Sequence, residues 1–262
     1  MIFAAYFLGF IFYSFLGWIW ETTYCSITAK HFINRGFLNG PIIPIYGLGA
    51  VMVMLAVNAF GGHLLQKEAF DINIITILLV FFGGMILATL LEYSAAVILE
   101  SLFHLKLWDY SENKFNFQGK ICLRSSLFFG LLSVIFIMVI EPLTTTVTTQ
   151  IPDMVIYIAV GIICAVLAVD ITITLSSLLK LNDRLHAAEE LINTRVGNTL
   201  VEAAKIRDNL HEKIEERMDE NLLVSRLHYQ IRRMAKAYPG SISLKHNEIW
   251  ERLKNQLNKP AK

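Results

Sequence analysis

The sequence predicts an all-α, polytopic membrane protein of about five transmembrane helices, followed by a long cytoplasmic helix of amphipathic or coiled-coil type. Of its 262 residues, 55% are hydrophobic and 17% are charged, whereas soluble domains contain roughly 25% charged residues. The charges are unevenly placed, since most of them follow Lys180 and few precede Ile140. We therefore predict a transmembrane domain at residues 1–175 and a cytoplasmic helical tail at residues 176–262.

Five stretches of the sequence are long and apolar enough to cross a bilayer, which takes about 20 mostly apolar residues. They lie at about Phe3–Ile27, Ile45–Leu65, Ile72–Leu91 (or on to Phe103), Leu123–Ile140 and Met154–Ile173. The first begins with MIFAAYFLGFIFYSF, which lacks the basic region and the small-residue cleavage site of a signal peptide. We therefore expect this stretch to be a retained span.

The loops between these spans differ in positive charge, and this difference predicts their sides of the membrane. The loop after the second span contains Lys67 as its one cation, and the loop after the fourth, EPLTTTVTTQIPD, contains no Lys or Arg. The other two loops carry Lys30, Arg35, Lys106, Lys114, Lys120 and Arg124. Because short loops rich in Lys and Arg remain cytoplasmic, we predict an external N-terminus and a cytoplasmic C-terminus.

The C-terminal region has a different pattern. Over Leu178–Ala237, apolar residues recur at intervals of three and four and charges fill the other faces, which is typical of an amphipathic helix or a coiled coil. Tyr238-Pro239-Gly240-Ser241 is expected to end this helix, and a short one over Ser243–Leu257 to follow it. So narrow an apolar stripe needs a partner, either a second copy or a fold-back of the chain. A self-associating stalk, as in a homodimer, and a docking arm for another protein both fit.

The second span is preceded by an irregular stretch, NRGFLNGPIIPIYGLGA, at Asn34–Ala50. Pro41 and Pro44 lack a backbone N–H and disfavour helix in the residue before them, so we expect the helix to start near Tyr46. Irregular backbone at membrane depth is tolerated where it is buried in protein or lines a wet cavity. The stretch is therefore either a tight turn packed for stability or a functional gate.

Ionisable residues of three spans are expected near the same cytoplasmic level. Glu21, Glu92 and Asp170 each lie about 16 to 20 residues along an inward-running span, and acids at such depth pair or face a cavity. We predict that Arg35 pairs with Glu21 or Glu92 while Asn34–Gly47 covers the pair. The predicted polar vestibule consists of Glu21, Arg35, Asn39, Glu92, Asp109, Arg124 and Asp170.

The second basic loop, LWDYSENKFNFQGKICLRSS, mixes aromatic and charged residues. It is either an elbow at the membrane interface, where aromatic rings collect, or a loop that brings Asp109 and Arg124 to the acids. The three cysteines, Cys25, Cys122 and Cys164, are scattered and lack metal-ligand spacing. We therefore expect free thiols, no metal site and no cofactor.

Several segments in this order resemble the putative ABC-transporter type IV, or CmpB-like, membrane family. They are GWIWE (Gly17–Glu21), NRGFLNGPIIPIYGLG (Asn34–Gly49), LLEY (Leu90–Tyr93) and the loop Leu107–Ser126, and the resemblance covers roughly residues 5–175. The long helical tail extends beyond it. The resemblance implies a permease but no particular site residues.

Three classes of function remain open on these grounds. The first is a bacterial inner-membrane transport component; because the chain has no GxxxxGK[ST] phosphate loop, its ATPase would be a separate subunit. The second is a non-transporting scaffold or sensor whose spans orient the cytoplasmic helix. The third is a membrane-embedded enzyme that acts on lipid, although no catalytic motif supports an enzyme. The near-zero net charge of +1 implies no nucleic-acid partner, and the lipid bilayer is the expected environment.

Overall fold

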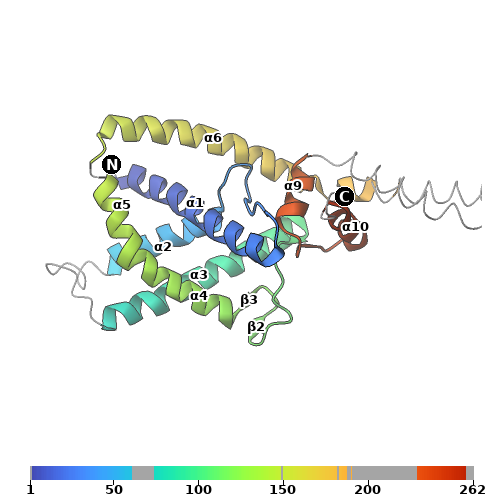
Figure 1. Cartoon of the computed structure of the whole chain (residues 1–262), viewed down its shortest axis with the longest axis horizontal. Coiled ribbons are helices and arrows are strands. Elements are labelled where there is room, and N and C mark those ends of the chain that lie inside the picture. The colour runs from blue at the N-terminus through green and yellow to red at the C-terminus, as the bar shows by residue number, and fades with distance from the viewer. Residues whose placement is uncertain are drawn as a thin grey trace, which may run out of the picture. The chain divides into compact units, whose positions relative to one another are not determined.

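The computed structural model describes residues 2–60, 74–148, 150–181, 183–187, 190 and 229–257. Most of this part of the chain is helical, as the sequence predicts (Figure 1). Its helices are α1 (Ile2–Ala29), α2 (Pro44–Phe60), α3 (Ile74–Phe103), α4 (Leu123–Ile135), the π-helical turn η1 (Phe136–Ile140), α5 (Glu141–Thr148), α6 (Asp153–Leu179), α9 (Tyr229–Ala237) and α10 (Asn247–Leu257).

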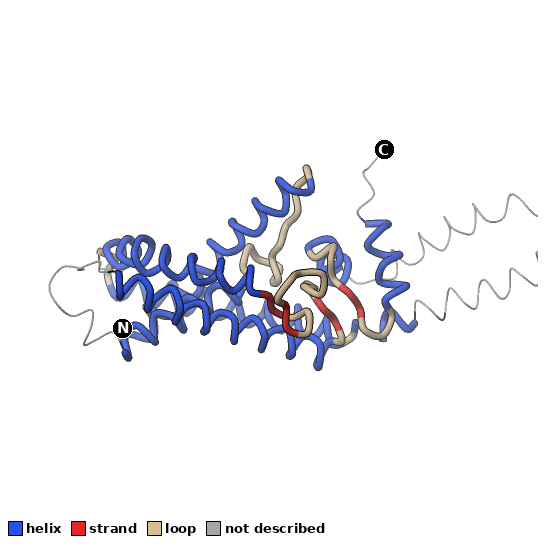
Figure 2. The backbone as a smooth tube through the Cα atoms, turned by 90° about the horizontal axis from the view of Figure 1, so that it is seen from below, coloured by secondary structure: helices blue, strands red, loops and turns tan. Residues whose placement is uncertain are grey.

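Two pairs of short antiparallel strands complete the described elements (Figure 2). Strand β2 (Asn116–Phe117) pairs with β3 (Ile121–Cys122), and β1 (Leu105–Lys106) pairs with β4 (Ile242–Ser243). The chain divides into an N-terminal unit of Met1–Val97 and Asp109–Ile171 and a C-terminal unit of Ile98–Trp108 and Thr172–Lys262. The end of α3 and the residues after it, 98–108, thus belong with the C-terminal residues, and the predicted domain boundary at residue 175 stays a prediction.

Four of the described helices are long and apolar enough to cross a membrane. They span Phe3–Ala29, Ile74–Phe103, Leu123–Thr144 and Asp153–Leu179, so the third predicted span does extend to Phe103. The described part of the second predicted span is a shorter apolar helix, α2, whose backbone becomes helical at Pro44, and residues 61–73 lie outside the described part. Proline suits the first turn of a helix, where an N–H has no partner in any case. The count of five spans therefore stays a prediction.

The fourth apolar helix contains a π-helical turn where it approaches a proline. α4 continues through η1 into α5 without a break, and Pro142 lies in the first turn of α5. A proline ring clashes with the carbonyl four residues earlier and leaves that carbonyl without a donor. The wider π turn at Phe136–Ile140 falls where this conflict arises, so the helix is deformed there and not ended.

Helices α3 and α4 approach closely through small residues. Ser126, Gly130 and Ser133 form the buried face of α4. Thr89 Oγ1 of α3 donates a hydrogen bond of 2.8 Å to Ser126 Oγ, and Gly84 lies directly against the side chain of Ser133. Small residues at intervals of three and four let helix backbones come close, which is how helices associate in membranes.

The C-terminal unit has a compact core of its own. Trp250 of α10 is fully buried and donates through Nε1 to Ser241 Oγ at 3.1 Å. Lys254 is 4% exposed, and its ammonium group donates to the carbonyl oxygens of Pro239 and Ser241. The predicted helix end at Tyr238–Ser241 is confirmed, since α9 ends at Ala237. The last helix begins at Asn247 and not at Ser243, because Ser243 belongs to β4.

Part of the predicted long helix lies within this unit. Leu178, Leu181 and Leu185, which open its apolar stripe, are buried there at 2%, 1% and 0% exposure. These residues therefore find their partners by fold-back within the chain. Residues 191–228 lie outside the described part, so the coiled coil and the oligomer stay predictions.

The packing of α3 against α4 predicts a position-specific effect of volume. Replacing Gly84 with leucine should lower the free energy of unfolding by about 1–3 kcal/mol, the usual cost of overpacking, because a Cβ there would overlap the Ser133 side chain. Gly83→Leu is the matched control, since a Cβ at Gly83 meets nothing within 4 Å. Thermal unfolding in detergent micelles should give a lower Tm for Gly84→Leu alone, and equal losses would contradict this packing.

Candidate functional site

The irregular segment between α1 and α2, residues 30–43, turns back along α1. Its backbone amides donate to α1 at successively earlier positions: Ile33 N–H to Ser26 Oγ at 2.9 Å, Arg35 N–H to Thr22 Oγ1 at 3.3 Å and Ile43 N–H to the Ser14 carbonyl at 3.1 Å. The twelve residues from Ser26 to Ser14 correspond to about 18 Å of helix. The second apolar crossing is thus broken into an irregular half and a helical half, α2.

Helix α2 begins beside the middle of α1 and packs closely against it. Gly47 lies against the Phe10 carbonyl and Ser14 Oγ, where a Cβ would overlap both. The Ser14 side chain is fully buried, and its Oγ has no hydrogen-bond partner within the described ranges. Gly47 is therefore needed for the close approach of α2 to α1. It is not needed for its backbone conformation, since among the described residues Gly119 is the glycine with a positive φ.

The far end of the irregular segment is held by α6. Both carboxylate oxygens of Asp170 accept hydrogen bonds: Oδ1 from Asn39 N at 2.9 Å and Asn39 Nδ2 at 2.7 Å, and Oδ2 from Gly40 N at 3.0 Å. The segment accordingly reaches α6 in Figure 1. The structure thus brings two predicted residues, Asn39 and Asp170, together as a tether of the segment.

The predicted pairing of Arg35 is confirmed for Glu21. Arg35 Nε lies 3.4 Å from Glu21 Oε2, and the two side chains are 15% and 27% exposed. The other oxygen, Glu21 Oε1, accepts from the hydroxyl of Tyr46 at 3.4 Å. Residues 31–43 are non-helical as predicted, although the helix begins at Pro44 and not near Tyr46. The Glu21 carboxylate therefore joins α1, the irregular segment and α2.

Glu92 of α3 is bound by neutral donors. It is 4% exposed, and it accepts from the Tyr110 hydroxyl at 3.0 Å and from Ser125 Oγ at 3.2 Å. Burial, followed by the neighbouring Glu92 carboxylate, raises the pKa of Tyr110 above its ordinary value. The phenol therefore stays protonated and donates. Glu92 interacts electrostatically with Glu21, so the two acids belong to one cluster.

We call this cluster the polar layer: Glu21, Arg35, Tyr46, Glu92, Tyr110 and Ser125. Sequence reasoning missed Tyr46, Tyr110 and Ser125 as site residues, although each lies in a segment that carries the family resemblance. Two predicted members lie elsewhere. The Asp109 carboxylate is exposed and accepts from Ser111 N at 2.9 Å in the β2–β3 loop, and Arg124 is exposed at the start of α4.

Of the two alternatives for the second basic loop, the one in which Arg124 reaches the acids is not seen in the described residues. Among the described residues, Arg124 forms no ion pair with Glu21 or Glu92. The physical reason is that Ser125, one residue later on α4, is the side chain directed at Glu92. Neighbouring helix positions point in different directions. The wider vestibule stays a prediction.

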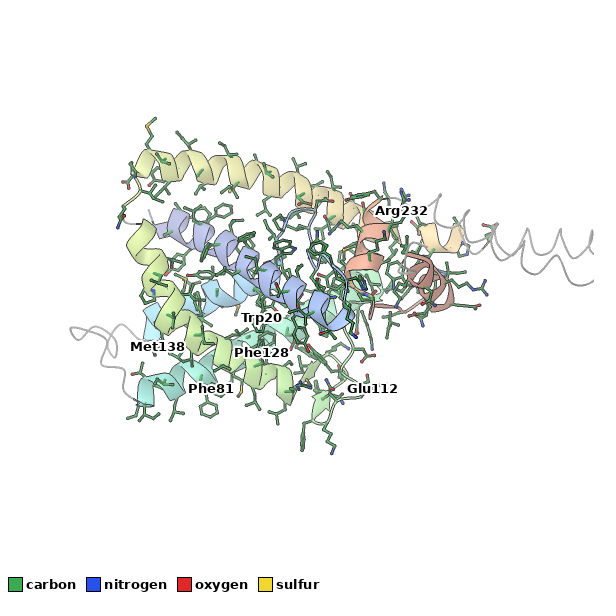
Figure 3. All side chains as sticks on the ribbon, viewed as in Figure 1. Trp20, Phe81, Glu112, Phe128, Met138 and Arg232 are labelled. Atoms are coloured by element: carbon green, nitrogen blue, oxygen red, sulfur yellow. The ribbon has the colours of Figure 1, made fainter. Side chains whose placement is uncertain are left out.

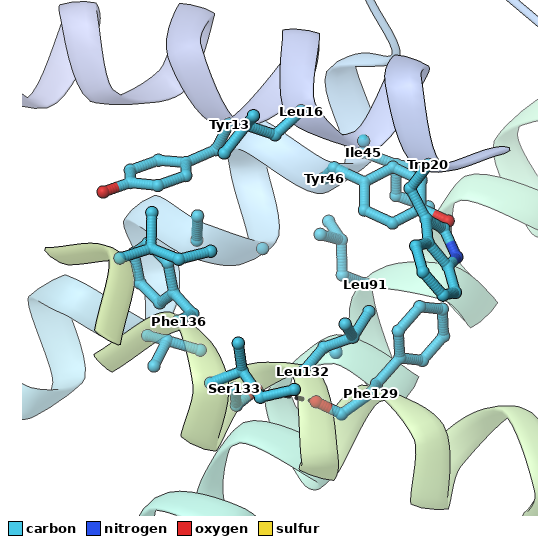
Figure 4. Close-up of a pocket in the computed structure, with 17 residues that line it drawn as sticks. Tyr13, Leu16, Trp20, Ile45, Tyr46, Leu91, Phe129, Leu132, Ser133 and Phe136 are labelled. Carbon is cyan, nitrogen blue, oxygen red and sulfur yellow. Dashed lines mark hydrogen bonds between the residues drawn. The ribbon is translucent and has the colours of Figure 1, made fainter. Parts of the chain in front are cut away.

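An apolar cavity of about 370 Å³ borders the polar layer (Figure 4). Its walls come from α1, α2, α3, α4 and η1, and the residues labelled in Figure 4 are Tyr13, Leu16, Trp20, Ile45, Tyr46, Leu91, Phe129, Leu132, Ser133 and Phe136. Tyr46 belongs to both features, because its ring lines the cavity and its hydroxyl bonds to Glu21. At the same end, Trp20 of α1 stacks on Phe128 of α4, with ring centroids 5.7 Å apart (Figure 3).

The polar layer contains ionisable side chains, but no set of metal-ligand residues is found in the described part of the chain. In the part of the chain that the structure describes, no group of three or more His, Cys, Asp or Glu residues is placed to hold a metal ion. The side chains of the polar layer can form hydrogen bonds and ion pairs, and its acids can take up protons.

The Tyr110–Glu92 bond predicts a stability effect with a defined pH dependence. Tyr110→Phe leaves a buried carboxyl without one donor and should lower the free energy of unfolding by about 1–3 kcal/mol. Because the pKa of Tyr110 is raised in the fold, its contribution is complete below about pH 10, the ordinary pKa, and declines as the pH rises above that value. Thermal unfolding of both proteins across this pH range measures the difference.

Tyr93→Phe provides the control for this prediction. Its hydroxyl donates at 3.3 Å to Gln118 in an exposed bond, which is worth little. The same atom is removed from a tyrosine in both variants. A Tyr110→Phe protein as stable as Tyr93→Phe at neutral pH would contradict the role given to the Glu92 bond.

Comparison with known proteins gives one match. The family model described as "putative ABC-transporter type IV" matches residues 8–175, which is well over half of the chain and contains the whole polar layer. No curated protein and no solved structure matches the chain.

Proposed function

Because the chain belongs to the putative ABC-transporter type IV family, which supports a transport-related role, we propose that it is the permease subunit of a bacterial inner-membrane transporter. In this proposal the polar layer lines a vestibule that faces the cytoplasm, and a separate ATPase subunit supplies the energy. The chain itself acts without enzymatic chemistry.

The broken second crossing is the observation that carries this proposal. Many transporters build their binding sites from discontinuous helices, with irregular backbone and half-helix termini beside the substrate. Here the irregular segment ends and α2 begins next to the Glu21–Arg35 pair. Irregular backbone and buried ionisable groups both cost free energy in a membrane. Their presence at one level is better explained by a transport pathway than by a tight turn.

The C-terminal unit favours a second candidate, the non-transporting scaffold or sensor. Pairing of β1 with β4 and the fully buried Trp250 give this unit a defined structure at the ends of α3 and α6. A scaffold would present that unit to a soluble partner and would need no vestibule. The two candidates therefore differ in whether the polar layer matters for activity.

Purification of the full-length chain from its native membrane in mild detergent tests the transport role. We expect an ATPase subunit to accompany it, detected as ATP hydrolysis by the complex. Glu21→Gln should lower this hydrolysis while assembly and Tm change little, because the Glu21–Arg35 pair would act in the transport cycle. Glu248→Gln, which alters an exposed ion pair to Arg252 at 2.8 Å, is the control. A complex without ATP hydrolysis would contradict the proposal, and equal Tm and activity losses in Glu21→Gln would favour the scaffold.

The orientation of the chain in this proposal has its own test. Lysine and arginine in the loops favour a cytoplasmic C-terminus, so a cysteine at position 245, which is exposed, should react with a membrane-impermeant maleimide only after the cells are permeabilised. Cys25, Cys122 and Cys164 are first replaced by serine. Labelling of Lys245→Cys in intact cells would reverse the orientation.

A further inference from the structure

We propose that the cavity between α1, α2, α3 and α4 takes one acyl chain of a membrane lipid, whose ester carbonyl accepts a hydrogen bond from Trp20. This inference adds a substrate class to the proposed transport role. That the cavity is a substrate site rests on that proposed role. The cavity lies wholly within the N-terminal unit.

The walls of the cavity that come from α1 and α4 include exposed side chains. Two of its lining side chains, Trp20 of α1 and Ile135 of α4, are 49% and 40% exposed. Such a surface of a membrane helix faces lipid, so an acyl chain reaches the cavity from the bilayer without crossing water. A volume of about 370 Å³ lies at the lower end of the range of roughly 300–1,000 Å³ for small-molecule sites. This size suits one chain better than a whole lipid.

The walls of the cavity are unsuited to water. A buried water needs two to four polar partners, yet the hydroxyls that line the cavity are already bonded. Tyr13 pairs with Thr144 Oγ1 at 3.0 Å, Tyr46 donates to Glu21, and Ser133 Oγ donates to the Phe129 carbonyl at 2.9 Å. The remaining surface consists of aliphatic and aromatic side chains. A hydrocarbon chain can pack against such a wall without leaving a polar group unbonded.

One polar group at the mouth of the cavity remains available. The indole N–H of Trp20 has no hydrogen-bond partner among the described residues, and it lies at the same end as the Tyr46 hydroxyl and the polar layer (Figure 4). Tryptophan commonly occupies the interface level, with its ring in apolar surroundings and its N–H toward polar groups. An acyl ester offers a carbonyl acceptor directly beside its chain. Trp20 therefore sets the end at which the lipid head lies.

Photolabelling of the full-length protein tests occupancy of the cavity. Vesicles of phosphatidylcholine contain a small share of the same lipid with a diazirine near the end of one acyl chain, and adducts are mapped by mass spectrometry. We expect adducts on the lining residues Leu132 and Phe136 as well as on Leu131, which is 51% exposed. Ala50→Phe, which fills the cavity, should abolish the first two and leave Leu131 labelled. Ala165→Phe on the exposed face of α6 should change nothing.

A second filling variant keeps the test decisive. Ala88→Phe fills the same cavity from α3. If one of the two variants misfolds, the other still tests the proposal. The proposal would be overturned if the wild-type adducts were confined to Leu131, or if the lining residues were still labelled in both filling variants. It would also be overturned if the lining residues cross-linked to a second copy of the chain. Labelling needs no ATP. If the complex hydrolyses ATP but the lining residues are not labelled, this proposal alone is overturned. If the lining residues are labelled but no ATP hydrolysis accompanies the chain, the transport role alone is overturned.

The role of Trp20 has a separate readout. An ether-linked phosphatidylcholine lacks the carbonyl, so it should label the lining residues about two- to tenfold less than the ester lipid, as expected for the loss of one hydrogen bond. In Trp20→Phe the ester and ether lipids should label equally. A difference between the lipids that persists in Trp20→Phe would exclude Trp20 as the donor.

Discussion

The backbone of residues 30–43 lies beside the C-terminal half of α1, where its amide groups must be bonded to protein because lipid offers them no partner. Side chains and carbonyls of α1 meet this requirement on one side, through Ser14, Thr22 and Ser26. Asp170 of α6 meets it on the other, with three accepted hydrogen bonds. The start of α2 and the position of Arg35 both depend on this bonding. Without it, the polar layer would lose the cation that compensates Glu21.

The two acids of the polar layer are stabilised in different ways. Glu21 has a guanidinium and a phenol as partners, whereas Glu92 has a phenol and an alcohol. A neighbouring guanidinium favours the charged form of a carboxyl, whereas a carboxyl bound only by neutral donors lacks a compensating charge. Because the two acids interact, a change in the protonation of one alters the other. The layer thus combines an ion pair with a carboxyl that is bound by neutral donors.

Hydropathy and loop charge were sufficient to predict an all-α membrane protein, because apolar length is a local property of the sequence. The Glu21–Arg35 pair followed from depth along α1, since 3.6 residues per turn fixes where a residue lies. For Arg124 depth was not sufficient, because depth says nothing about the direction in which a side chain points around its helix. Tyr110 and Ser125 could not be chosen from the sequence for a related reason: only the fold of the β2–β3 loop and the rotation of α4 direct them at Glu92. The course of residues 30–43 along α1 depends on tertiary hydrogen bonds and was likewise not readable.

The return of residues 30–43 along α1 also constrains biosynthesis. A nascent segment that enters the bilayer with unpaired amides is rejected toward the aqueous side, so the irregular half of this crossing depends on hydrogen-bond acceptors elsewhere in the protein. Its acceptors on α1 have already been synthesised, but Asp170 emerges from the ribosome about 130 residues later. Until α6 has been synthesised, residues 30–43 can therefore form their hydrogen bonds to α1 but not those to Asp170. Assembly of the polar layer is thus a late event in the maturation of the chain.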